Sequence, residues 1–336
     1  MTDLLVVALG GNAISPAGGT GTAAEQTLNL RASMAQLAEV VAAGTNVVVT
    51  HGNGPQVGAL LIKNELARDV VPAVPLDWCV ANTQATIGFV AATALMRQLA
   101  IRGIDRTVVP LISRVLVDAD DPAFANPSKP VGPWLTAEEA RARVAETGHS
   151  YGDQGERGWR RLVPSPEPRE SLDLRAVELL VEDGAIVVTN GGGGIPMVLA
   201  EGDGLEGIEA VIDKDLAAAM LATELAADGL VILTDVQGVA VDFGTPDQRW
   251  LGEVTVAELR GHAADGQFRA GSMRPKVSAA IRFVEASGHR AVIASLDEMA
   301  AAVAGTAGTQ VLPPDVPDMP AVARPVTDTV PGAPNG

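Results

Sequence analysis

The sequence predicts an α/β fold in which helices cover both faces of a mainly parallel open sheet. Apolar, largely β-branched runs alternate with long helical stretches almost from end to end. The strand runs are apolar throughout rather than at every second residue, as in strands that are buried on both faces. This alternation is typical of right-handed βαβ crossovers. One proline-rich stretch, residues 112–168, interrupts it and predicts an excursion from the sheet.

Six apolar runs predict the strands of the sheet. The first of them has no basic segment before it and no small-residue cleavage site after it, so we interpret it as a strand and not as a leader peptide. In chain order the predicted strands are Leu4–Leu9, Asn46–Thr50, Arg106–Ile112, Ala185–Asn190, Leu230–Thr234 and Arg290–Ala294.

Six longer stretches predict the helices that connect these strands. Thr255 stands directly before the fifth of them and is its expected N-cap, because a hydroxyl oxygen can accept a bond from a free N–H of the first turn. The predicted helices are Ala23–Ala43, Leu76–Ala100, Leu172–Glu182, Lys214–Ala226, Val256–His262 and Pro275–Ser287.

Two segments differ from the rest of the chain. Residues 112–168, called the lid below, contain seven prolines and two tryptophans but only one short predicted helix, Ala137–Thr147. We expect them to protrude from the sheet as a small subdomain or lid. Residues 313–336 contain seven further prolines and few apolar residues, which predicts a disordered tail after an α/β domain of residues 1–312.

Composition excludes several classes of function. The net charge of −17 disfavours a broad surface for nucleic acid or anionic lipid. No run of 18 uncharged apolar residues is present, so no membrane span is predicted. Cys79 is the only cysteine and cannot form an internal disulfide, which favours a reducing cytoplasmic location. A small anionic substrate remains compatible with the charge, because a few cations in one cleft can outweigh a distant negative surface.

Three glycine-rich turns follow predicted strands: Gly10–Ala13, His51–Gly58 and Gly191–Pro196. Turns at the carboxyl ends of parallel strands meet over the ligand. Glycine lets backbone N–H groups approach phosphate oxygens, and a helix that begins after the turn adds its positive dipole end. Together the three turns predict an anion site.

The second turn also approximates the glycine fingerprint of dinucleotide-binding proteins, which is the alternative interpretation. That fingerprint normally follows the first strand and is followed by an acidic residue about 20 positions later. Here it follows the second strand, and residues 65–75 offer only a helix end and a loop. A Walker A phosphate loop is absent from the sequence.

The lysines are few and unusually placed. Of the 24 basic residues only four are lysines, and Lys129, Lys214 and Lys276 all lie at turns or helix starts, whereas Lys63 lies on the polar face of a helix. A flexible ammonium group can follow negative charge as a phosphoryl group moves between oxygens, a transfer that depends mainly on positioning and electrostatics. Asp215 is positioned in the sequence to act as a shared carboxylate partner for these lysines.

Eight segments together resemble the carbamate kinases, a branch of the amino acid kinase family. The resemblance covers about residues 4–312 and is specific because the segments occur in the family's order. They are Ala8–Ala13, Thr50–Gly58, Pro75–Gln84, Asp121–Gly132, Arg157–Pro166, Gly191–Pro196, Glu209–Asp215 and Gly271–Lys276. Two positions depart from the family pattern: Glu156 stands where a glycine is expected, and Gln237 where an aspartate is common.

The resemblance implies a three-layer αβα sandwich with a protruding lid subdomain, acting as a homodimer in the cytoplasm. It implies reversible phosphoryl transfer between ATP and carbamate, giving ADP and carbamoyl phosphate, usually in fermentative arginine breakdown. Lys129, Lys214 and Lys276 are expected to contact phosphoryl oxygens, with Asp215 organising the lysines. The carbamate and transferred phosphate are expected against Gly10, Gly11, Asn12, Gly52 and Asn53.

For the nucleotide, the resemblance implies ATP or ADP over the C-terminal half, with Mg²⁺ held chiefly by the phosphates and no protein metal site. The expected contacts are Thr234, Asp235, Val236, Val239, Phe243, Pro246, Gly271 and Met273.

Three rival functions follow from the same residues. The nearest is another amino acid kinase that acts on a different small carboxylate or phosphonate; such relatives carry a lysine beside the first glycine turn, and residues 1–11 contain none. The others are a nucleotide-binding protein without catalysis and an NAD-dependent oxidoreductase. We interpret His51 and Cys79 as structural, because carbamate is already anionic and no nucleophile motif accompanies the cysteine.

Overall fold

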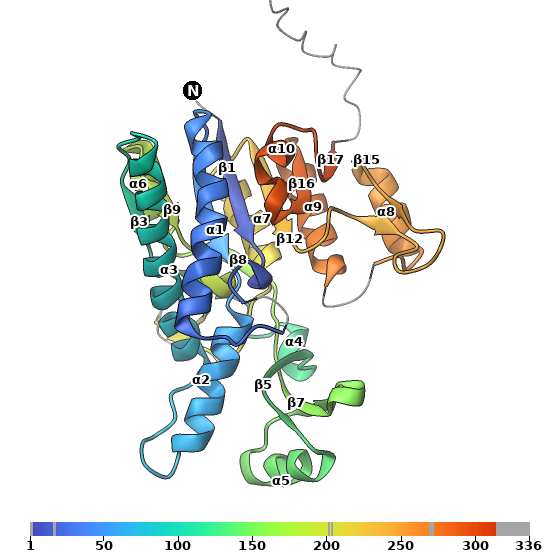
Figure 1. The fold of residues 1–336 in the computed structure, drawn as a ribbon. Helices are drawn as coiled ribbons and strands as arrows, with labels where there is room; N and C mark the ends of the chain where they lie inside the picture. The colour runs from blue at the N-terminus through green and yellow to red at the C-terminus, as the bar shows by residue number, and fades with distance from the viewer. Residues whose placement is uncertain (1–2, 16–17, 201, 203, 269–271, 314–336) are drawn as a thin grey trace, which may run out of the picture.

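The structure is a computed structural model that describes residues 3–15, 18–200, 202, 204–268 and 272–313 (Figure 1). Its main sheet has eight strands in these residues, in the order β15-β17-β16-β12-β1-β2-β9-β3. All neighbours are parallel except β16 and β17, so the predicted class of fold is confirmed. The strands are β1 Leu4–Leu9, β2 Asn46–His51, β3 Val108–Pro110, β9 Ile186–Val188, β12 Gly229–Thr234, β15 Glu253–Thr255, β16 Ala291–Ser295 and β17 Thr309–Leu312.

All six predicted strands are present, but two are shorter than expected. The run predicted from Arg106 to Ile112 pairs only as β3, and the run from Ala185 to Asn190 only as β9. Beyond the paired residues, the Leu111 N–H still donates to the Val188 carbonyl oxygen at 2.9 Å. Two strands at the other edge of the sheet, β15 and β17, escaped prediction because they are only three and four residues long.

Helices cover both faces of the sheet and make it the middle of three layers. The alternating side chains of β1 show this, since Val7 packs in one apolar cluster and Val6 in the other. The first cluster is covered by α1 Ala23–Ala42, α3 Leu76–Ile101 and α10 Met299–Val303. The second is covered by α6 Leu174–Glu182, α7 Lys214–Glu224, α8 Val256–Ala264 and α9 Met273–Ser287.

The helix ends follow from local chemistry. Thr255 caps α8 as predicted: its hydroxyl accepts a bond from the Glu258 N–H, and the Glu258 carboxylate accepts one from the Thr255 N–H. Helix α2, Gly54–Ala67, starts with Pro55 in its first turn, where a missing N–H costs nothing. Helix α3 is long and apolar enough in composition to cross a membrane, yet over half of that window is buried inside the molecule, as in a core helix.

A second, four-stranded sheet lies beside the main one in the order β11-β10-β4-β8. Sequence patterns did not predict it, because its strands are short and only partly buried. Strand β10 follows the third glycine turn, so the chain passes from the main sheet through this second sheet before it reaches α7. The strands are β4 Arg114–Val117, β8 Pro168–Ser171, β10 Ile195–Leu199 and β11 Leu205–Gly207, and a separate ribbon joins β13 Ala240–Val241 to β14 Arg249–Trp250.

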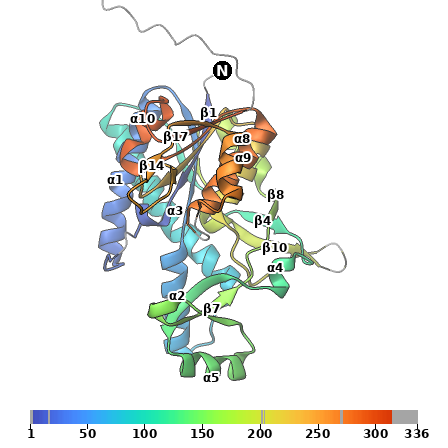
Figure 2. The ribbon, with the colours of Figure 1, turned by 90° about the vertical axis from the view of Figure 1, so that its right-hand side faces the viewer.

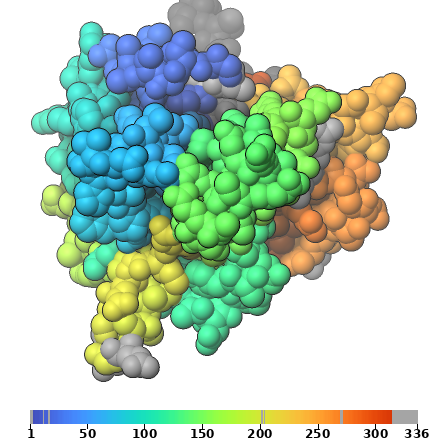
Figure 3. All heavy atoms as spheres, turned by 90° about the horizontal axis from the view of Figure 1, so that it is seen from below, coloured from blue at the N-terminus to red at the C-terminus, as the bar shows by residue number. Residues whose placement is uncertain are grey.

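The lid forms a separate piece below the main sheet, next to α2 (Figures 1 and 2). The predicted helix appears with the expected bounds as α5, Ala137–Thr147, and α4 Pro122–Ala125 precedes it. The rest is an antiparallel sheet in the order β5-β7-β6, with β5 Lys129–Leu135, β6 Tyr151–Asp153 and β7 Trp159–Val163. From below, the lid surface lies directly against that of α2 (Figure 3).

Prolines hid the strands of the lid from sequence analysis. Pro130 and Pro133 lie within β5. This strand is at the edge of its sheet and is paired on one side only, so it tolerates prolines, which have no backbone N–H to donate. The first lid residues, Arg114–Val117, pair as β4 in the second sheet rather than within the protruding piece.

Candidate active site

A cavity of about 1010 Å³ opens at the carboxyl ends of β1, β2 and β12. These three strands are parallel neighbours, so the turns that follow them converge at one edge of the sheet. Lid residues 128–130 contribute to the wall of the cavity. The structure brings ten of the predicted site residues together there: Gly10, Gly11, Gly52, Asn53, Lys129, Lys214, Asp215, Thr234, Asp235 and Lys276.

The first two glycine turns pack against each other in the cavity wall. A β-carbon on Gly52 would lie 3.0 Å from the backbone nitrogen of Gly11 and 3.3 Å from the Lys214 side chain. A β-carbon on Gly10 would lie 3.0 Å from the Leu233 carbonyl oxygen. A side chain at Gly52 would press on the turn of Gly11, and one at Gly10 would press on the end of β12, so glycine at both positions allows this close packing. The Asn12 side chain lies outside the described residues.

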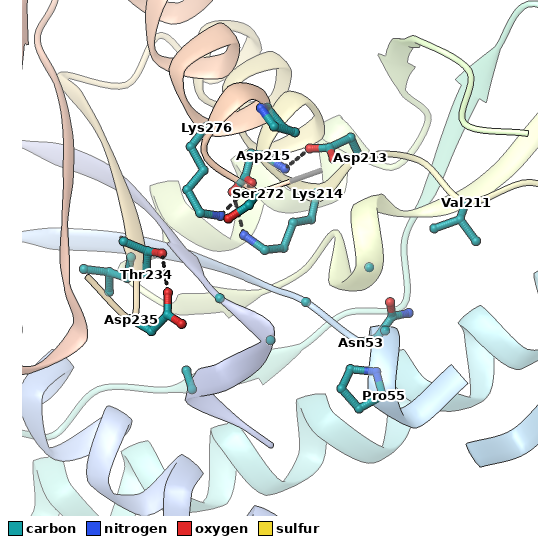
Figure 4. A pocket seen from close by; sticks show the side chains of 18 of the residues that line it. Asn53, Pro55, Val211, Asp213, Lys214, Asp215, Thr234, Asp235, Ser272 and Lys276 are labelled. Atoms are coloured by element: carbon teal, nitrogen blue, oxygen red, sulfur yellow. Dashed lines mark hydrogen bonds and ion pairs between the residues drawn. The ribbon is translucent and has the colours of Figure 1, made fainter. Parts of the chain in front are cut away.

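Two core lysines share one buried carboxylate. Lys214 Nζ lies 2.5 Å from Asp215 Oδ1, and Lys276 Nζ lies 3.0 Å from Asp215 Oδ2. The three side chains are only 15%, 12% and 5% exposed for Lys214, Lys276 and Asp215. Both lysines stand in the first turns of helices, α7 and α9, and both converge on Asp215 (Figure 4). The two ammonium groups are thus held side by side before any substrate arrives.

Burial and the neighbouring charges together set the pKa of Asp215 and of Lys214. Burial alone would raise the pKa of Asp215, but the ammonium groups of Lys214 and Lys276 outweigh it and lower that pKa to about 2. Burial lowers the pKa of Lys214, an effect that Asp215 opposes and Lys276 reinforces. Asp215 is therefore a carboxylate at every pH at which the protein works, and it offsets the repulsion between the lysines.

The third lysine has a different partner. Lys129 begins β5 in the lid, is 33% exposed, and places its Nζ 3.2 Å from Asp213 Oδ2. The structure pairs Asp215 with two of the lysines and Asp213 with the third, so the expectation that Asp215 organises all of them is corrected. Sequence analysis missed Asp213, although an aspartate directly before a helix is a common N-cap.

The third glycine turn lines the cavity with Gly192 and also supports the residues around it. Its Gly192 has a positive φ of 68°, and a β-carbon there would lie 2.1 Å from the Asn53 amide nitrogen. A β-carbon on Gly191 would lie 2.4 Å from the His51 ring. The turn thus makes room for Asn53, whose amide nitrogen donates to the Thr83 hydroxyl at 2.9 Å.

On the expected nucleotide side, Thr234 and Asp235 line the cavity, with the Thr234 hydroxyl 3.1 Å from an Asp235 carboxylate oxygen. Three of the other expected residues lie outside the cavity wall: Val239 is enclosed in the core, Met273 packs against that core, and Phe243 forms an edge contact with Trp250. Val236 and Pro246 are not in the wall either, and Gly271 lies outside the described residues.

His51 and Cys79 are both buried. Burial is the main reason that the pKa of His51 falls to about 4; the bond between its Nδ1 and the Gly52 carbonyl opposes this, and the Lys214 charge adds to it. The ring is therefore neutral near pH 7 and packs beneath the turns. Burial also raises the pKa of the Cys79 thiol, which opposes formation of a thiolate nucleophile.

The two departures from the family pattern lie on the surface. Glu156 is exposed on a single turn of 3-10 helix, Gly155–Arg157, and does not have a positive φ, whereas Gly155 and Gly158 on either side do. A glycine is therefore not required by the backbone at position 156. Gln237 is exposed after β12 and does not line the cavity.

Comparison with known proteins gives consistent results. The profile of the Amino acid kinase family matches residues 3–295. A carbamate kinase of Thermococcus kodakarensis is 49% identical over 92% of this chain and 98% of its own length, and one of Trichomonas vaginalis is 42% identical over 92% and 99%. Among solved structures, the carbamate kinase of Giardia lamblia bound to AMP-PNP superimposes with a TM-score of 0.88 at 38% identity, covering 93% of this chain and 99% of that one.

Proposed function

We infer the function from one premise: the chain belongs to the amino acid kinase family, and it aligns over nearly its full length with carbamate kinases. We propose that it is a carbamate kinase, which transfers a phosphoryl group reversibly between ATP and carbamate. In one direction a carbamate oxygen attacks the γ-phosphorus of ATP and the bond to ADP breaks, giving carbamoyl phosphate. In the other direction the phosphoryl group of carbamoyl phosphate passes to ADP.

The observation that carries this proposal is the arrangement of three ammonium groups over two glycine turns. Lys214 and Lys276 are fixed by Asp215, and Lys129 lines the same cavity from the lid. In an in-line transfer, negative charge spreads over the equatorial oxygens and shifts between the attacking and leaving oxygens. Cations and backbone N–H groups on that path stabilise the transition state more than the ground state. Carbamate is already an anion, so the neutral, buried His51 is not needed as a base.

The nucleotide is proposed to lie on the Thr234–Asp235 side of the cavity, supported by the relative that binds AMP-PNP. Among the described residues, no three acidic, histidine or cysteine side chains gather into a metal site. We propose that Mg²⁺ would be carried chiefly by the nucleotide phosphates, as its preference for retained water allows. When bound, it neutralises charge on the β- and γ-oxygens.

We also propose that two copies of the chain associate through α3. Trp78, Phe89 and Met96 are 60%, 57% and 51% exposed on this helix. They are 11 and 7 residues apart, or about three and two helical turns, so they form one apolar stripe. A stripe of this kind is covered in a symmetric dimer by the same stripe of the second copy. We further propose a cytoplasmic location and a role in arginine breakdown, as the resemblance to carbamate kinases implies.

A coupled assay tests the function directly. With carbamoyl phosphate and ADP as substrates and Mg²⁺ present, we expect ATP to form at a rate proportional to the protein concentration. Acetyl phosphate with ADP, and N-acetylglutamate with ATP, serve as parallel substrate pairs, because a related kinase of different specificity would prefer one of them. Turnover of either at a higher kcat/KM than that of carbamoyl phosphate would refute the assignment.

A further inference from the structure

Asp213 connects the lid lysine to the helix that carries the core lysine pair. Its Oδ1 accepts bonds from the backbone N–H groups of Asp215 at 2.9 Å and Leu216 at 3.4 Å, which makes it the N-cap of α7. Its Oδ2 faces Lys129 Nζ at 3.2 Å. One carboxylate therefore holds both the start of α7 and the ammonium group of a residue 84 positions earlier in the chain.

We propose that Asp213 is a positioning residue for the transfer, which acts by holding the Lys129 ammonium group at the cavity. This rests on the proposed function above. Asp213 lines the cavity and is 19% exposed, so its charge faces the space that an anionic substrate must enter. A bare carboxylate there would repel phosphoryl oxygens, whereas one neutralised by Lys129 does not. The pair thus supplies an oriented donor at little cost to anion binding.

The geometry leaves Lys129 free to serve a substrate while it stays bound to Asp213. An ammonium group has three N–H donors, and the structure shows one carboxylate oxygen of Asp213 as its polar contact. Lys129 is also more exposed than the core lysines, at 33% against 15% and 12%. Without Asp213 such a side chain would sample many rotamers in solvent, so fewer bound complexes would have its ammonium group placed for the transfer.

A backbone contact places the same two segments together. The Val211 N–H donates to the Pro164 carbonyl oxygen at 3.0 Å, which ties the segment before Asp213 to the end of the lid. Pro164 follows β7, the partner strand of β5, in which Lys129 lies opposite Val163. The backbone bond therefore sets the distance between the segments, and the ion pair sets the direction of the ammonium group.

The substitution Asp213→Asn separates the two roles of the residue. Asparagine is nearly the same size and is as good an N-cap as aspartate, so α7 keeps its cap. It removes the charge that holds Lys129. We expect kcat for carbamoyl phosphate and ADP to fall about three- to tenfold, as for a partly exposed ion pair. The KM for carbamoyl phosphate should stay the same or fall, because Lys129 is no longer neutralised.

A double-mutant cycle with Lys129→Met tests whether Asp213 acts through the lysine. If it does, Asp213→Asn should cost little or nothing in kcat in the Lys129→Met background. An equal loss of kcat in both backgrounds would overturn the proposal, as would an unchanged kcat or a raised KM in the single variant. Asp173→Asn is the matched control: Asp173 also precedes a helix and pairs with an arginine, Arg114, but lies outside the cavity.

Two further measurements keep the outcomes separate. Thermal unfolding and ADP binding of Asp213→Asn show whether α7 and the cavity are intact, and Asp213→Ala, which loses both roles, should lower the unfolding temperature as well as kcat. If the wild-type protein forms no ATP from carbamoyl phosphate, the proposed function fails. If the wild type turns over and the cycle shows no coupling, only the role of Asp213 fails.

Discussion

The core lysines and the lid lysine reach the same cavity from parts of the molecule that are built differently. Lys214 and Lys276 stand in the first turns of two helices that pack on the main sheet, and they share one carboxylate that is 5% exposed. Lys129 begins an edge strand of a small three-stranded sheet and pairs with a separate aspartate. The difference indicates that the core pair is preorganised, whereas the position of the lid lysine depends on how the lid is held.

The strongest test of this difference is Lys276→Met, which keeps the length of the side chain but removes its charge. Because Lys276 is 12% exposed and fixed by Asp215, we expect kcat to fall roughly a hundred- to thousandfold, or about 2.7–4 kcal/mol, as for the loss of one preorganised donor. Steady-state kinetics with carbamoyl phosphate and ADP measure it.

Lys63→Met is the matched control, because Lys63 is an exposed lysine on α2 outside the cavity. It should leave kcat and KM unchanged. A loss of activity for Lys276→Met no larger than that for Lys63→Met would show that the core pair is not part of the reaction.

The outcome of the sequence analysis divides along the same line. The core was predictable, because continuous apolar runs and long helices are local patterns, and the shortage of lysines drew attention to Lys214 and Lys276, as it did to Lys129 in the lid. The lid was harder: prolines concealed β5, and the pairing of Lys129 with Asp213 joins residues 84 positions apart, which no local pattern reveals. The third glycine turn was predicted as part of the anion site, and its Gly192 lines the cavity, but the sequence did not show that Gly191 and Gly192 also make room for His51 and Asn53.

The residues expected to contact the nucleotide differ in whether they line the cavity. The resemblance, and not periodicity, predicts that the stretch after β12 contacts the nucleotide. A resemblance does not distinguish a side chain in a cavity wall from one beneath it. Val239 is enclosed in the core, whereas Thr234 and Asp235 line the cavity. The direction of a side chain after the last residue of a strand depends on tertiary packing, which is not encoded in a short motif.

A second prediction concerns the pH dependence of the core region. His51 is buried beneath the turns near Lys214, and its pKa falls from 6.5 to about 4 on folding. Between these values the unfolded chain binds more protons than the folded one, so stability rises with pH and is lost as the pH falls from about 6.5 to 4. The contribution of this single group is about 3 kcal/mol. Denaturant unfolding at several pH values measures it.

His51→Gln isolates that contribution, because glutamine cannot take up a proton. The variant should lose less stability than the wild type between pH 6.5 and 4.5, whatever its stability at pH 7. Equal slopes of unfolding free energy against pH in the two proteins would contradict a buried, neutral His51. Carboxylates such as Asp215 titrate in both proteins and cancel in the comparison.

A smaller effect than that of Lys276→Met is expected for Lys129→Met in the lid. Lys129 is 33% exposed and bound to one carboxylate oxygen, so its field at the substrate is screened more strongly than that of the core lysines. We expect kcat/KM to fall about ten- to fiftyfold, or about 1.4–2.3 kcal/mol.

Removing the Lys129 ammonium group also leaves Asp213 without its cation, so the KM for carbamoyl phosphate should rise. Added salt should reduce that rise by screening the unpaired carboxylate. Lys276→Met should show no such salt dependence, since both oxygens of Asp215 are buried and Lys214 remains in contact with one of them. Kinetics of both variants at low and high ionic strength therefore separate the two regions. Equal losses of kcat/KM and equal salt dependence would show that the lid lysine is as rigidly placed as the core pair. The contrast between the two regions would then not exist.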